Sequence, residues 1–444
     1  MDHFAQIAEA GASASSTLFI GPFALLVLAI PVLLLGEFIF HRVGWLHRAN
    51  VPAPIIGGLL VAITLAILAQ AAPGLVTLQG STANAVWLWP VLPQWGLGAP
   101  SMTDVERPLL ILFFTCIGFN ASWSVARQGG LPLVILLALS IGLSAVQAAT
   151  GALTALALGE TPLLGLMASN VSLMGGFGTA AGFAPEFEKA GLVGAASIGL
   201  TAAVFGVVAG GLVAGWTGGR LVQRKLHRVG EGSVSLQQLE SASAEPAGFI
   251  AELKELARSA RSVLLHLAAL VVCMKLGAFL SVFIQSSGLT FPVYMGSMIV
   301  AAILRNAHDL LRGNVLKTER VDAIGSVALM WLLAVVMIDL QLAQLLGSAL
   351  PLLVILAVQV ALMAALAYFV TFRLMGRDYE AAVTSAGMIG YGLGATSNAM
   401  ATMRVMIRRF GPAPRSMLIV PIVGSFLVDF FNAVLTTTAL NVLK

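Results

Sequence analysis

The sequence predicts an all-α polytopic membrane protein with two inverted-topology repeats, each containing five transmembrane helices and a re-entrant hairpin. Three observations support this: the apolar composition, a pair of glycine-rich interruptions, and the distribution of Lys and Arg. Of the 444 residues, 58% are hydrophobic and only 10% are charged. The apolar runs continue over about 20 residues, the length of a membrane-spanning helix, whereas strands of a membrane β-barrel alternate apolar and polar residues. We therefore expect a helical bundle.

Two glycine-rich stretches, 169–179 and 385–398, interrupt this apolar sequence. The second has four glycines within eight positions. Each Gly costs a helix interior roughly 1 kcal/mol relative to Ala, so a break in the helix is expected. Lipid cannot satisfy the N–H and C=O groups that a break frees, so the broken backbone has to line a cavity. Interrupted segments in corresponding positions of two halves indicate the binding site of a secondary transporter.

The N-terminal repeat is expected over residues 1–219, with its re-entrant segment at 162–187. Its first apolar run, 17–40, is too long for the core of a signal peptide and is preceded by acidic residues instead of a basic region. This run should therefore remain in the protein as a transmembrane helix. The other four spans of the repeat are expected at 52–71, 108–122, 131–158 and 192–215.

Residues 220–261 form the only long polar stretch and are predicted to link the two repeats, with a partly helical segment near Ala251–Ser259. The C-terminal repeat, 262–444, then follows the same plan. Its re-entrant segment is expected at 380–402. Its five spans are expected at 262–284, 291–305, 322–346, 350–372 and 416–441.

Short landmarks recur in the same order in the two halves, which favours an internal repeat over chance similarity between apolar segments. The offsets between equivalent residues drift modestly, from 214 to 238. The landmarks are Leu131-Pro-Leu-Val-Ile-Leu136 with Leu350-Pro-Leu-Leu-Val-Ile355, Met174-Gly-Gly-Phe-Gly178 with Met388-Ile-Gly-Tyr-Gly392, and Pro54 and Gly58 with Pro292 and Gly296.

The basic residues predict the orientation of the chain. Five spans per half make the halves inverted, and the linker then shares one side of the membrane with five short loops. These segments hold 20 of the 24 Lys and Arg residues, so by the positive-inside rule the linker is cytoplasmic and both termini are outside. One hairpin then enters from each side, which suits alternating access to a shared site. The same orientation explains the net charge of +4 without a nucleic-acid partner.

The two hairpin tips carry uncharged polar groups and glycine backbone. The N-terminus of a half-helix offers partial positive charge and free N–H groups, which can hold an anion, while freed carbonyls and Ser, Thr or Asn oxygens suit a sodium ion. The alternative is that Gly and Ser only permit close helix packing in the bilayer. The predicted substrate-binding residues are Ser172, Gly175, Gly176, Phe177, Gly178, Thr179, Gly390, Tyr391, Gly392, Thr396, Ser397 and Asn398.

Three further polar residues are candidate sodium ligands. Asp429 and Asn432 are three positions apart in an apolar helix and therefore share one face. A carboxylate at the centre of a membrane helix costs roughly 2.5–3.5 kcal/mol, which favours a cation or a hydrogen-bonding partner beside it. Both roles remain open for Asp429. The third candidate, Asn120, is equivalent to Asp339 at an offset of 219, and both are expected near helix ends.

Enzymatic activity is not indicated. The six His residues show no ligand spacing, and Cys116 and Cys273 lie far apart in apolar runs, where buried thiols are expected. A P-loop sequence, GxxxxGK[ST], is absent, which argues against ATP-driven transport by this chain. The Gly-Tyr-Gly sequence at 390–392 is a weak match to a potassium filter, because such a filter needs a fourfold ring of short loops. No cofactor is expected besides Na⁺ as a coupling ion.

Six motifs spread along almost the whole chain carry a family resemblance: Pro52-Ala-Pro-Ile-Ile-Gly-Gly-Leu-Leu60, Phe113-Phe-Thr-Cys-Ile-Gly-Phe-Asn-Ala121, Gly175-Gly-Phe-Gly-Thr179, Gly390-Tyr-Gly-Leu-Gly-Ala-Thr396, Arg409-Phe-Gly-Pro412, and Val420-Pro-Ile-Val-Gly-Ser-Phe426 with Asp429 and Asn432. With these motifs the chain resembles the bacterial sodium/glutamate symporter family. The resemblance implies sodium-coupled uptake of glutamate, elevator-like movement of a substrate-carrying domain, a homodimer, and a place in the bacterial inner membrane and its lipid bilayer. The chain departs from the family at Phe177 and Met388, where the family usually has His.

Three functions are therefore compared. The first is a sodium-coupled symporter of glutamate or a related small carboxylate. The second keeps the carrier but gives it a less charged organic solute, because Phe177 and Met388 each replace an imidazole by an apolar group. The third is a passive channel built on the same hairpins.

Overall fold

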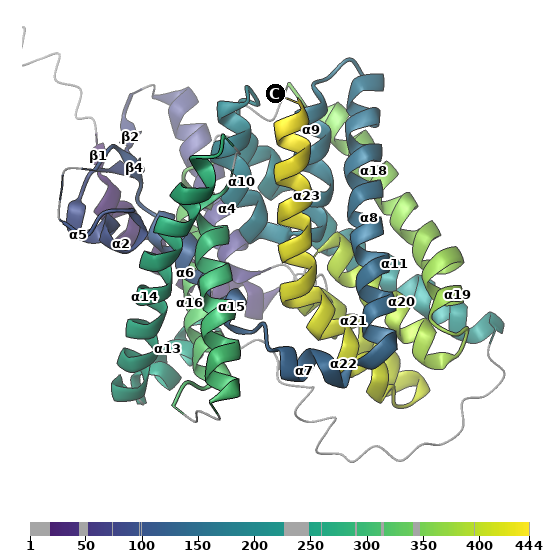
Figure 1. The fold of residues 1–444 in the computed structure, drawn as a ribbon. Helices are drawn as coiled ribbons and strands as arrows, with labels where there is room; N and C mark the ends of the chain where they lie inside the picture. Colours follow the sequence, from purple (N-terminus) through teal and green to yellow (C-terminus); the bar gives the residue numbers. More distant parts are fainter. Residues whose placement is uncertain are drawn as a thin grey trace, which may run out of the picture.

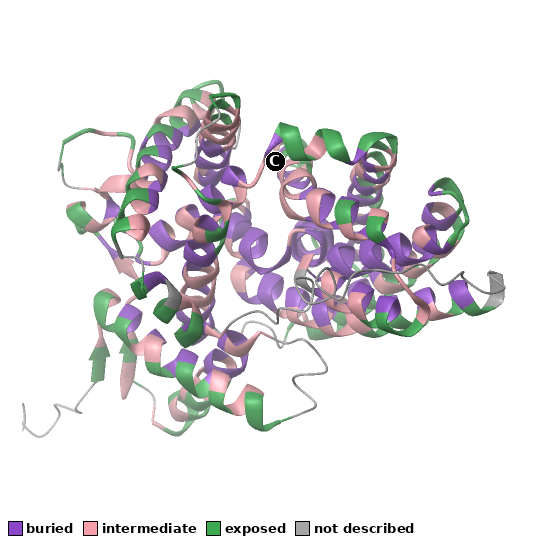
Figure 2. Ribbon diagram, turned by 90° about the horizontal axis from the view of Figure 1, so that it is seen from below, coloured by how far each residue is buried: buried purple, intermediate pink, exposed green. Residues whose placement is uncertain are grey.

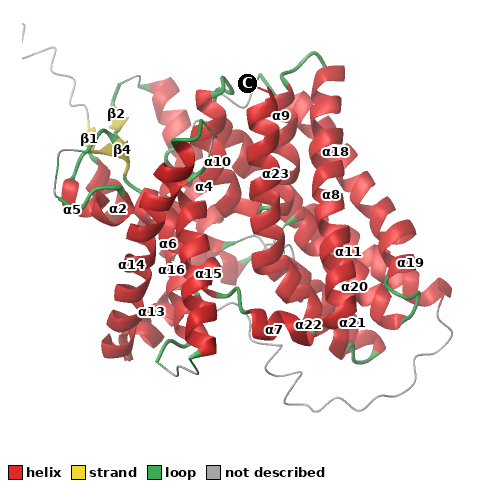
Figure 3. Ribbon diagram, viewed as in Figure 1, coloured by secondary structure: helices red, strands yellow, loops and turns green. Residues whose placement is uncertain are grey.

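The structure is a computed structural model that describes residues 18–43, 52–72, 74–96, 98, 100–225, 248–258, 260–288, 291–311, 315–340, 347–394 and 396–443. Helices dominate it (Figures 1 and 3). They pack as two groups, and each group combines helices from both halves of the sequence. We call these the scaffold group and the hairpin group.

The scaffold group lies on the left of Figure 1. Its members contact one another in a continuous network, in which α6 packs on α15 and α16, and α2 packs on α4. The group consists of α2 (Pro22–Arg42), α4 (Ala53–Ala71), α6 (Arg107–Phe119), α13 (Phe249–Arg258), α14 (Ala260–Gln285), α15 (Val293–Leu310) and α16 (Thr318–Ile338).

The hairpin group lies on the right of Figure 1. The long helix α11 (Ala195–Lys225) is central to it, because it contacts parts of both predicted hairpins. The other members are α8 (Gly130–Ala157), α9 (Pro162–Leu166), η2 (Met167–Met174), α10 (Gly176–Lys189), α18 (Ala349–Leu366), η3 (Ala367–Thr371), α19 (Phe372–Leu374), α20 (Tyr379–Leu393), α21 (Thr396–Phe410), α22 (Pro414–Ile422), η4 (Val423–Leu427) and α23 (Val428–Leu443). The short helix α7 (Trp123–Gln128) connects the two groups.

A helix occurs at each of the ten predicted spans. Among the described residues, eight helices are long and apolar enough to cross a membrane, so the chain is a multi-span membrane protein. The exceptions are α6, with 13 residues, and α15, which carries Arg305, His308 and Asp309 in its last turns. At 1.5 Å per residue α6 is about 20 Å long, shorter than the roughly 30 Å hydrocarbon core.

Several predicted boundaries need correction. Helix α11 continues to Lys225 instead of ending at 215, and α16 ends at Ile338 instead of 346, with 341–346 outside the described residues. The prolines that precede α4 and α15 are Pro52 and Pro292. In the linker, α13 confirms the helical segment, whereas 226–247 lies outside the described residues.

The all-helical prediction missed four short strands near the start of the chain. Strand β1 (Leu18–Ile20) pairs in parallel with β2 (Val76–Leu78), and β3 (Ser81–Thr82) pairs antiparallel to β4 (Thr103–Asp104). The predicted first span, 17–40, therefore begins with a strand. Its helix starts at Pro22, because a Pro in the first turn needs no N–H partner and breaks any continuation from before.

Close helix contacts hold the scaffold group together. A Cβ on Gly36 would lie 2.0 Å from the Ala53 carbonyl oxygen, and one on Gly277 would lie 2.2 Å from the Ser297 Cα. These positions accept only Gly, because the backbones of α2 and α4, and of α14 and α15, touch there. Figure 2 shows the result: buried residues fill the centre of both groups and exposed ones lie on the outer helix faces. Exposed apolar side chains on those faces match a surface that contacts lipid.

Candidate functional site

The first hairpin is broken inside the predicted stretch. Helix α9 and the π-helix η2 run to Met174, and α10 begins at Gly176, whose φ of +68° is one that side chains disfavour. A second irregularity lies at Ser169, with φ −116° and ψ −112° inside η2. π-Helical turns inside membrane helices are frequent at functional sites, because they free or redirect backbone groups.

The second hairpin consists of α20 and α21. The two helices run antiparallel, because a Cβ on Gly390 would lie 2.4 Å from the Ala399 Cα, and one on Gly387 would lie 2.7 Å from the Met403 sulfur. The backbone turns at Gly394, with φ −150° and ψ −81°. The glycines at 387 and 390 therefore allow close packing of the hairpin arms. Figure 1 places α9 and α10 in the upper part of the molecule and α20 and α21 in the lower part.

The breaks of the two hairpins meet. The Cβ position of Gly176 is 3.0 Å from the Gly394 carbonyl oxygen, so the start of α10 lies beside the end of α20. Helix α11 passes the same point, where Asn398 Nδ2 donates a 3.0 Å hydrogen bond to the Val207 carbonyl. The N-terminus of α10 carries partial positive charge and the C-terminus of α20 partial negative charge. The junction can therefore hold an anionic group and a cation a short distance apart.

Asn432, on the last helix α23, forms hydrogen bonds with the first hairpin. Its Oδ1 accepts hydrogen bonds from Ser144 Oγ at 2.6 Å and from Asn170 Nδ2 at 2.9 Å, and its Nδ2 donates to the Asn170 carbonyl at 3.0 Å. Asn170 Nδ2 also donates to Thr436 Oγ1 at 2.9 Å. Asn432 and Asn170 are buried. The predicted sodium ligand Asn432 thus has a demonstrated interhelical role between α8, η2 and α23.

Several predicted substrate ligands already have partners within the bundle. Tyr391 shares a 2.6 Å hydrogen bond with Ser140 on α8. Ser172 Oγ donates to the Met167 carbonyl and Thr396 Oγ1 donates to the Gly424 carbonyl, both at 2.5 Å. The Ser397 side chain lies outside the described part of the chain. Gly178, Thr179 and Gly392 are buried close to the breaks, and Gly175 is partly exposed.

Phe177 and Met388 occupy different surroundings. Phe177, at the start of α10, packs in an apolar cluster with Ile55 of α4 and Leu333 of α16, so it faces the scaffold group. Met388 lies on α20 and its sulfur accepts a 3.1 Å hydrogen bond from Thr371 Oγ1 in the π-helix η3. Only Phe177 therefore lies where the two groups contact each other.

The three predicted sodium ligands lie on two elements, Asp429 and Asn432 on α23 and Asn120 at the end of α6. Asn120 ends α6 and donates a 2.6 Å hydrogen bond to Asp322 within the scaffold group. Asp339 likewise ends α16, so the expectation that both positions lie at helix ends is confirmed. Asp429 lies in the first turn of α23. Among the described residues no hydrogen bond joins Asn120 to Asp429 or Asn432.

Two buried glutamines that the sequence prediction did not include lie beside the tip of α20. Gln147 Nε2 donates a 3.0 Å hydrogen bond to the Gly392 carbonyl, and Gln359 Nε2 donates one of the same length to the Gln147 carbonyl. Each is a polar residue deep in a long apolar helix, α8 or α18. That isolation is the signal that could have identified them.

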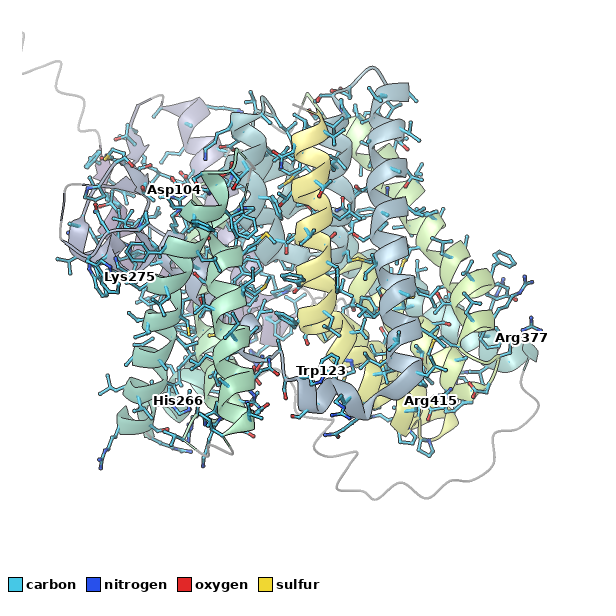
Figure 4. The ribbon with its side chains drawn as sticks, in the orientation of Figure 1. Asp104, Trp123, His266, Lys275, Arg377 and Arg415 are labelled. Atoms are coloured by element: carbon cyan, nitrogen blue, oxygen red, sulfur yellow. The ribbon has the colours of Figure 1, made fainter. Side chains whose placement is uncertain are left out.

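An acidic cleft of about 230 Å³ lies between the two groups, at the start of α6. Its walls carry Asp104, Glu106 and Asp339 from the scaffold side and Glu188 from α10, with Arg107 beside them. Figure 4 shows Asp104 in the upper part of the molecule. Burial, reinforced by the Asp104 charge, raises the pKa of Glu106 to about 8. Burial also raises the pKa of Glu188 and Asp339.

In the described ranges, no cluster of three His, Cys, Asp or Glu residues could hold a metal ion. A cation at the junction would therefore depend on amide, hydroxyl and main-chain oxygens. Such oxygens suit a hard monovalent cation and not a transition metal.

A membrane-spanning bundle in which two broken hairpins meet is the architecture of a secondary transporter. A family model for the sodium/glutamate symporter matches residues 20–100 and 85–412. The chain belongs to the sodium/glutamate symporter family. Its relatives are transporters, in agreement with the expectation that the protein is not an enzyme.

Curated relatives match nearly the whole chain. The sodium/glutamate symporter of Haemophilus influenzae is 34% identical over 421 residues, covering 94% of this chain and 97% of the relative. The sodium/glutamate symporter of Escherichia coli is 33% identical over 413 residues, covering 92% and 95%. Among solved structures, a sodium proton antiporter from Methanocaldococcus jannaschii is 14% identical, with a TM-score of 0.39, and the match covers 94% of this chain and 96% of the antiporter.

Proposed function

We propose that this protein carries out sodium-coupled symport of glutamate or a related small carboxylate by alternating access. The observation that carries the proposal is the meeting of the two helix breaks, with the Cβ position of Gly176 3.0 Å from the Gly394 carbonyl. This junction places a helix N-terminus and a helix C-terminus side by side inside a membrane bundle. Membership of the family and its curated relatives support the choice of sodium and glutamate.

The substrate carboxylate would bind at the first turn of α10, where the N–H groups of Gly176, Phe177 and Gly178 have no partner within the helix. Sodium would bind to oxygens at the broken ends and, in this proposal, to Asp429, Asn432 and Asn120. The hairpin group would carry the substrate, and the sodium bound to its own residues, past the scaffold group. The apolar contact of Phe177 with α4 and α16 supports such sliding, since it contributes no directional bonds.

The net charge moved in each transport cycle depends on the number of sodium ions that accompany glutamate. Glutamate carries a net charge of −1, so transport with one sodium ion moves no charge. Moving one net charge is worth about 2.3 kcal/mol per 100 mV, so use of the membrane potential requires at least two sodium ions per glutamate.

The proposal includes a place in the bacterial inner membrane as a homodimer, with both termini periplasmic and the linker cytoplasmic. The distribution of Lys and Arg supports this orientation. Figure 4 shows Arg377 and Arg415 low in the molecule and Asp104 high. The C-terminus is at the upper side in Figure 1. Cysteine labelling of intact cells at Val442 and at Leu310 checks it: a membrane-impermeant reagent should react with a cysteine at 442 and not at 310.

Uptake into proteoliposomes tests the function. With a sodium gradient, labelled glutamate should accumulate severalfold more than with a choline gradient of equal size. A competition panel of amino acids and dicarboxylates then identifies the substrate. An absence of sodium-stimulated uptake of every carboxylate would overturn the proposal.

A second candidate function is sodium-coupled transport of a less charged organic solute. Phe177 favours it, because an apolar ring stands at the first turn of α10 where the family usually has His. In the competition panel, inhibition by neutral solutes and not by glutamate would support this candidate. A passive channel would instead give unitary currents in planar bilayers.

A further inference from the structure

The side chains of Gln147 and Gln359 each leave one oxygen unused. Both residues are fully buried, and both Oε1 atoms have no hydrogen-bond partner among the described residues. Leaving a buried acceptor without a partner costs about 1–3 kcal/mol, and a protein retains such groups where they serve a purpose. Two such oxygens, on residues that are hydrogen-bonded to each other, indicate that something absent from the bare chain completes the site.

The orientation of both amides is determined by their neighbours. Gln147 Nε2 donates to the Gly392 carbonyl and Gln359 Nε2 donates to the Gln147 carbonyl, each at 3.0 Å. Turning either amide over would place its oxygen against a carbonyl oxygen. Gln359 Nε2 also lies 3.1 Å from Thr150 Oγ1, whose own hydrogen is directed to the Val146 carbonyl at 2.7 Å. The unpaired atoms are therefore the oxygens and not the nitrogens.

The two glutamines link α18 and α8 to the broken end of α20, because Gln359 bonds to the Gln147 main chain and Gln147 bonds to Gly392. Gln147 bonds directly to Gly392, one residue before the last residue of that helix. The last carbonyls of a helix lack intrahelical partners and carry partial negative charge. Apolar side chains pack against Gly392 itself, because its Cβ position lies 2.4 Å from the Met363 methyl carbon and 3.4 Å from Leu143. An acceptor-rich, negative and dry site favours a cation.

We propose that Gln147 Oε1 and Gln359 Oε1, together with main-chain carbonyls at the broken end of α20, bind a sodium ion. The proposal rests on the proposed sodium-coupled function and adds a site that is distinct from Asp429, Asn432 and Asn120. Neutral amide and carbonyl oxygens are hard ligands, and they bind a monovalent ion without the charge that would hold it irreversibly. Because α8, α18 and α20 together form the site, occupancy by the ion stabilises the tip of the second hairpin.

Sodium binding is measured first without substrate. Sodium chloride, compared with choline chloride at equal ionic strength, should raise the thermal unfolding temperature of the purified wild-type protein in detergent. Gln147→Leu and Gln359→Leu remove one ligand each and should reduce this sodium-dependent shift by more than half. The control Gln128→Leu, in an exposed position on α7, should leave it unchanged.

Uptake measurements then connect the site to transport. The sodium concentration for half-maximal glutamate uptake should rise at least tenfold in Gln147→Leu and Gln359→Leu. Gln359→Glu adds a negative oxygen in the same volume and should lower that concentration below the wild-type value, which keeps the proposal testable if the Leu variants fold poorly.

Two results would overturn the site. One is a wild-type thermal shift that is the same in sodium and choline, which would indicate that only water completes these amides. The other is an unchanged sodium requirement in Gln359→Leu and Gln359→Glu. Failure of the proposed function is recognised separately, because the thermal shift does not depend on any transported carboxylate.

Discussion

Asn432 illustrates how much one amide contributes inside the membrane. It bonds to Ser144 and Asn170, and so joins α23 to α8 and to the first hairpin. Hydrogen bonds between membrane helices average about 0.6 kcal/mol and reach about 1.7 kcal/mol, because the unfolded state also finds partners.

Asn432→Ala should therefore lower the free energy of unfolding by about 2–3 kcal/mol, since three hydrogen bonds are lost and the Asn170 and Ser144 groups remain buried. Denaturation of the purified protein, followed by tryptophan fluorescence, measures this loss. Thr438→Ala is the matched control, because the Thr438 hydroxyl bonds only within its own helix and is exposed. Equal losses in the two variants would contradict the interhelical role.

Asp429→Asn tests the predicted coupling-ion role. Replacing a carboxylate by an amide removes the charge that attracts sodium but keeps a group that can form interhelical hydrogen bonds. We expect the sodium concentration for half-maximal uptake to rise by about tenfold or more, which corresponds to about 1.4 kcal/mol. Normal sodium dependence with reduced stability would instead assign Asp429 to helix packing.

Polar residues at the tips could be selected from the sequence, but their partners could not. The hydroxyls of Ser172 and Thr396 are polar and near a break, yet each bonds to a main-chain carbonyl. Gln147 was missed because its partner at Gly392 is 245 residues away. Pairings over such distances depend on the packing of whole helices, which no local pattern contains.

Among elements, the second hairpin depends most on its glycines. Gly390→Ala should prevent α20 and α21 from approaching, because the added Cβ would lie 2.4 Å from the Ala399 Cα. We expect a loss of stability of about 2–3 kcal/mol, typical of overpacking, and at least a tenfold fall in uptake. Thermal unfolding and uptake in proteoliposomes measure both.

Gly142→Ala serves as the control for this variant. Gly142 lies on the apolar helix α8, and a Cβ there would meet nothing within 4 Å. That variant should retain uptake and gain slightly in stability, because Ala favours the helix. If the two variants behaved alike, hairpin packing would not be the cause.

Helix positions followed from composition, whereas helix ends required turn chemistry and tertiary contacts. The breaks near 175 and 394 were predicted because clustered glycines cost helical stability. Strand β1 was missed because a three-residue strand has no periodicity of its own and exists only through pairing with β2. The predicted end of the α16 span at 346 followed the apolar residues beyond Ile338, where the helix ends.

At the scale of the molecule, the acidic cleft between the two groups gives stability a pH dependence. The pKa of Glu106 is about 8 in the folded protein and 4.5 when free. Between these values the folded state retains a proton that the unfolded state has lost, so stability falls as pH rises from about 4.5 to 8 and then levels off. Glu188 and Asp339 act in the same direction.

Glu106→Gln should remove much of this fall. Relative to wild type, the variant should gain a few kcal/mol between pH 5 and pH 9, from about 1.4 kcal/mol per unit of pKa shift. Thermal unfolding at a series of pH values measures the gain. Glu160→Gln, outside the cleft, is the control. A constant difference between Glu106→Gln and wild type over this range would contradict the raised pKa.

The sorting of helices into two groups was beyond prediction from the sequence. Local patterns defined two halves, 1–219 and 262–444, whereas the packing combines α2, α4 and α6 with α14, α15 and α16. A repeat in the sequence indicates which segments are alike but not which of them are neighbours. The family resemblance, in contrast, was carried by short motifs and is confirmed by the matches over nearly the whole chain.

Because helices from both halves of the sequence pack together, the order of their synthesis constrains folding in the membrane. When the ribosome has completed α11, the first three scaffold helices are in the membrane, but α14–α16, on which they pack, are not yet synthesised. The contact surfaces of α6 must remain covered by lipid or by the insertion machinery until the 113 residues from the end of α11 to the end of α16 at Ile338 have been synthesised. Folding is therefore completed only once the C-terminal half has been synthesised. When the two halves are expressed as separate chains, each should accumulate only if the other is produced in the same cell.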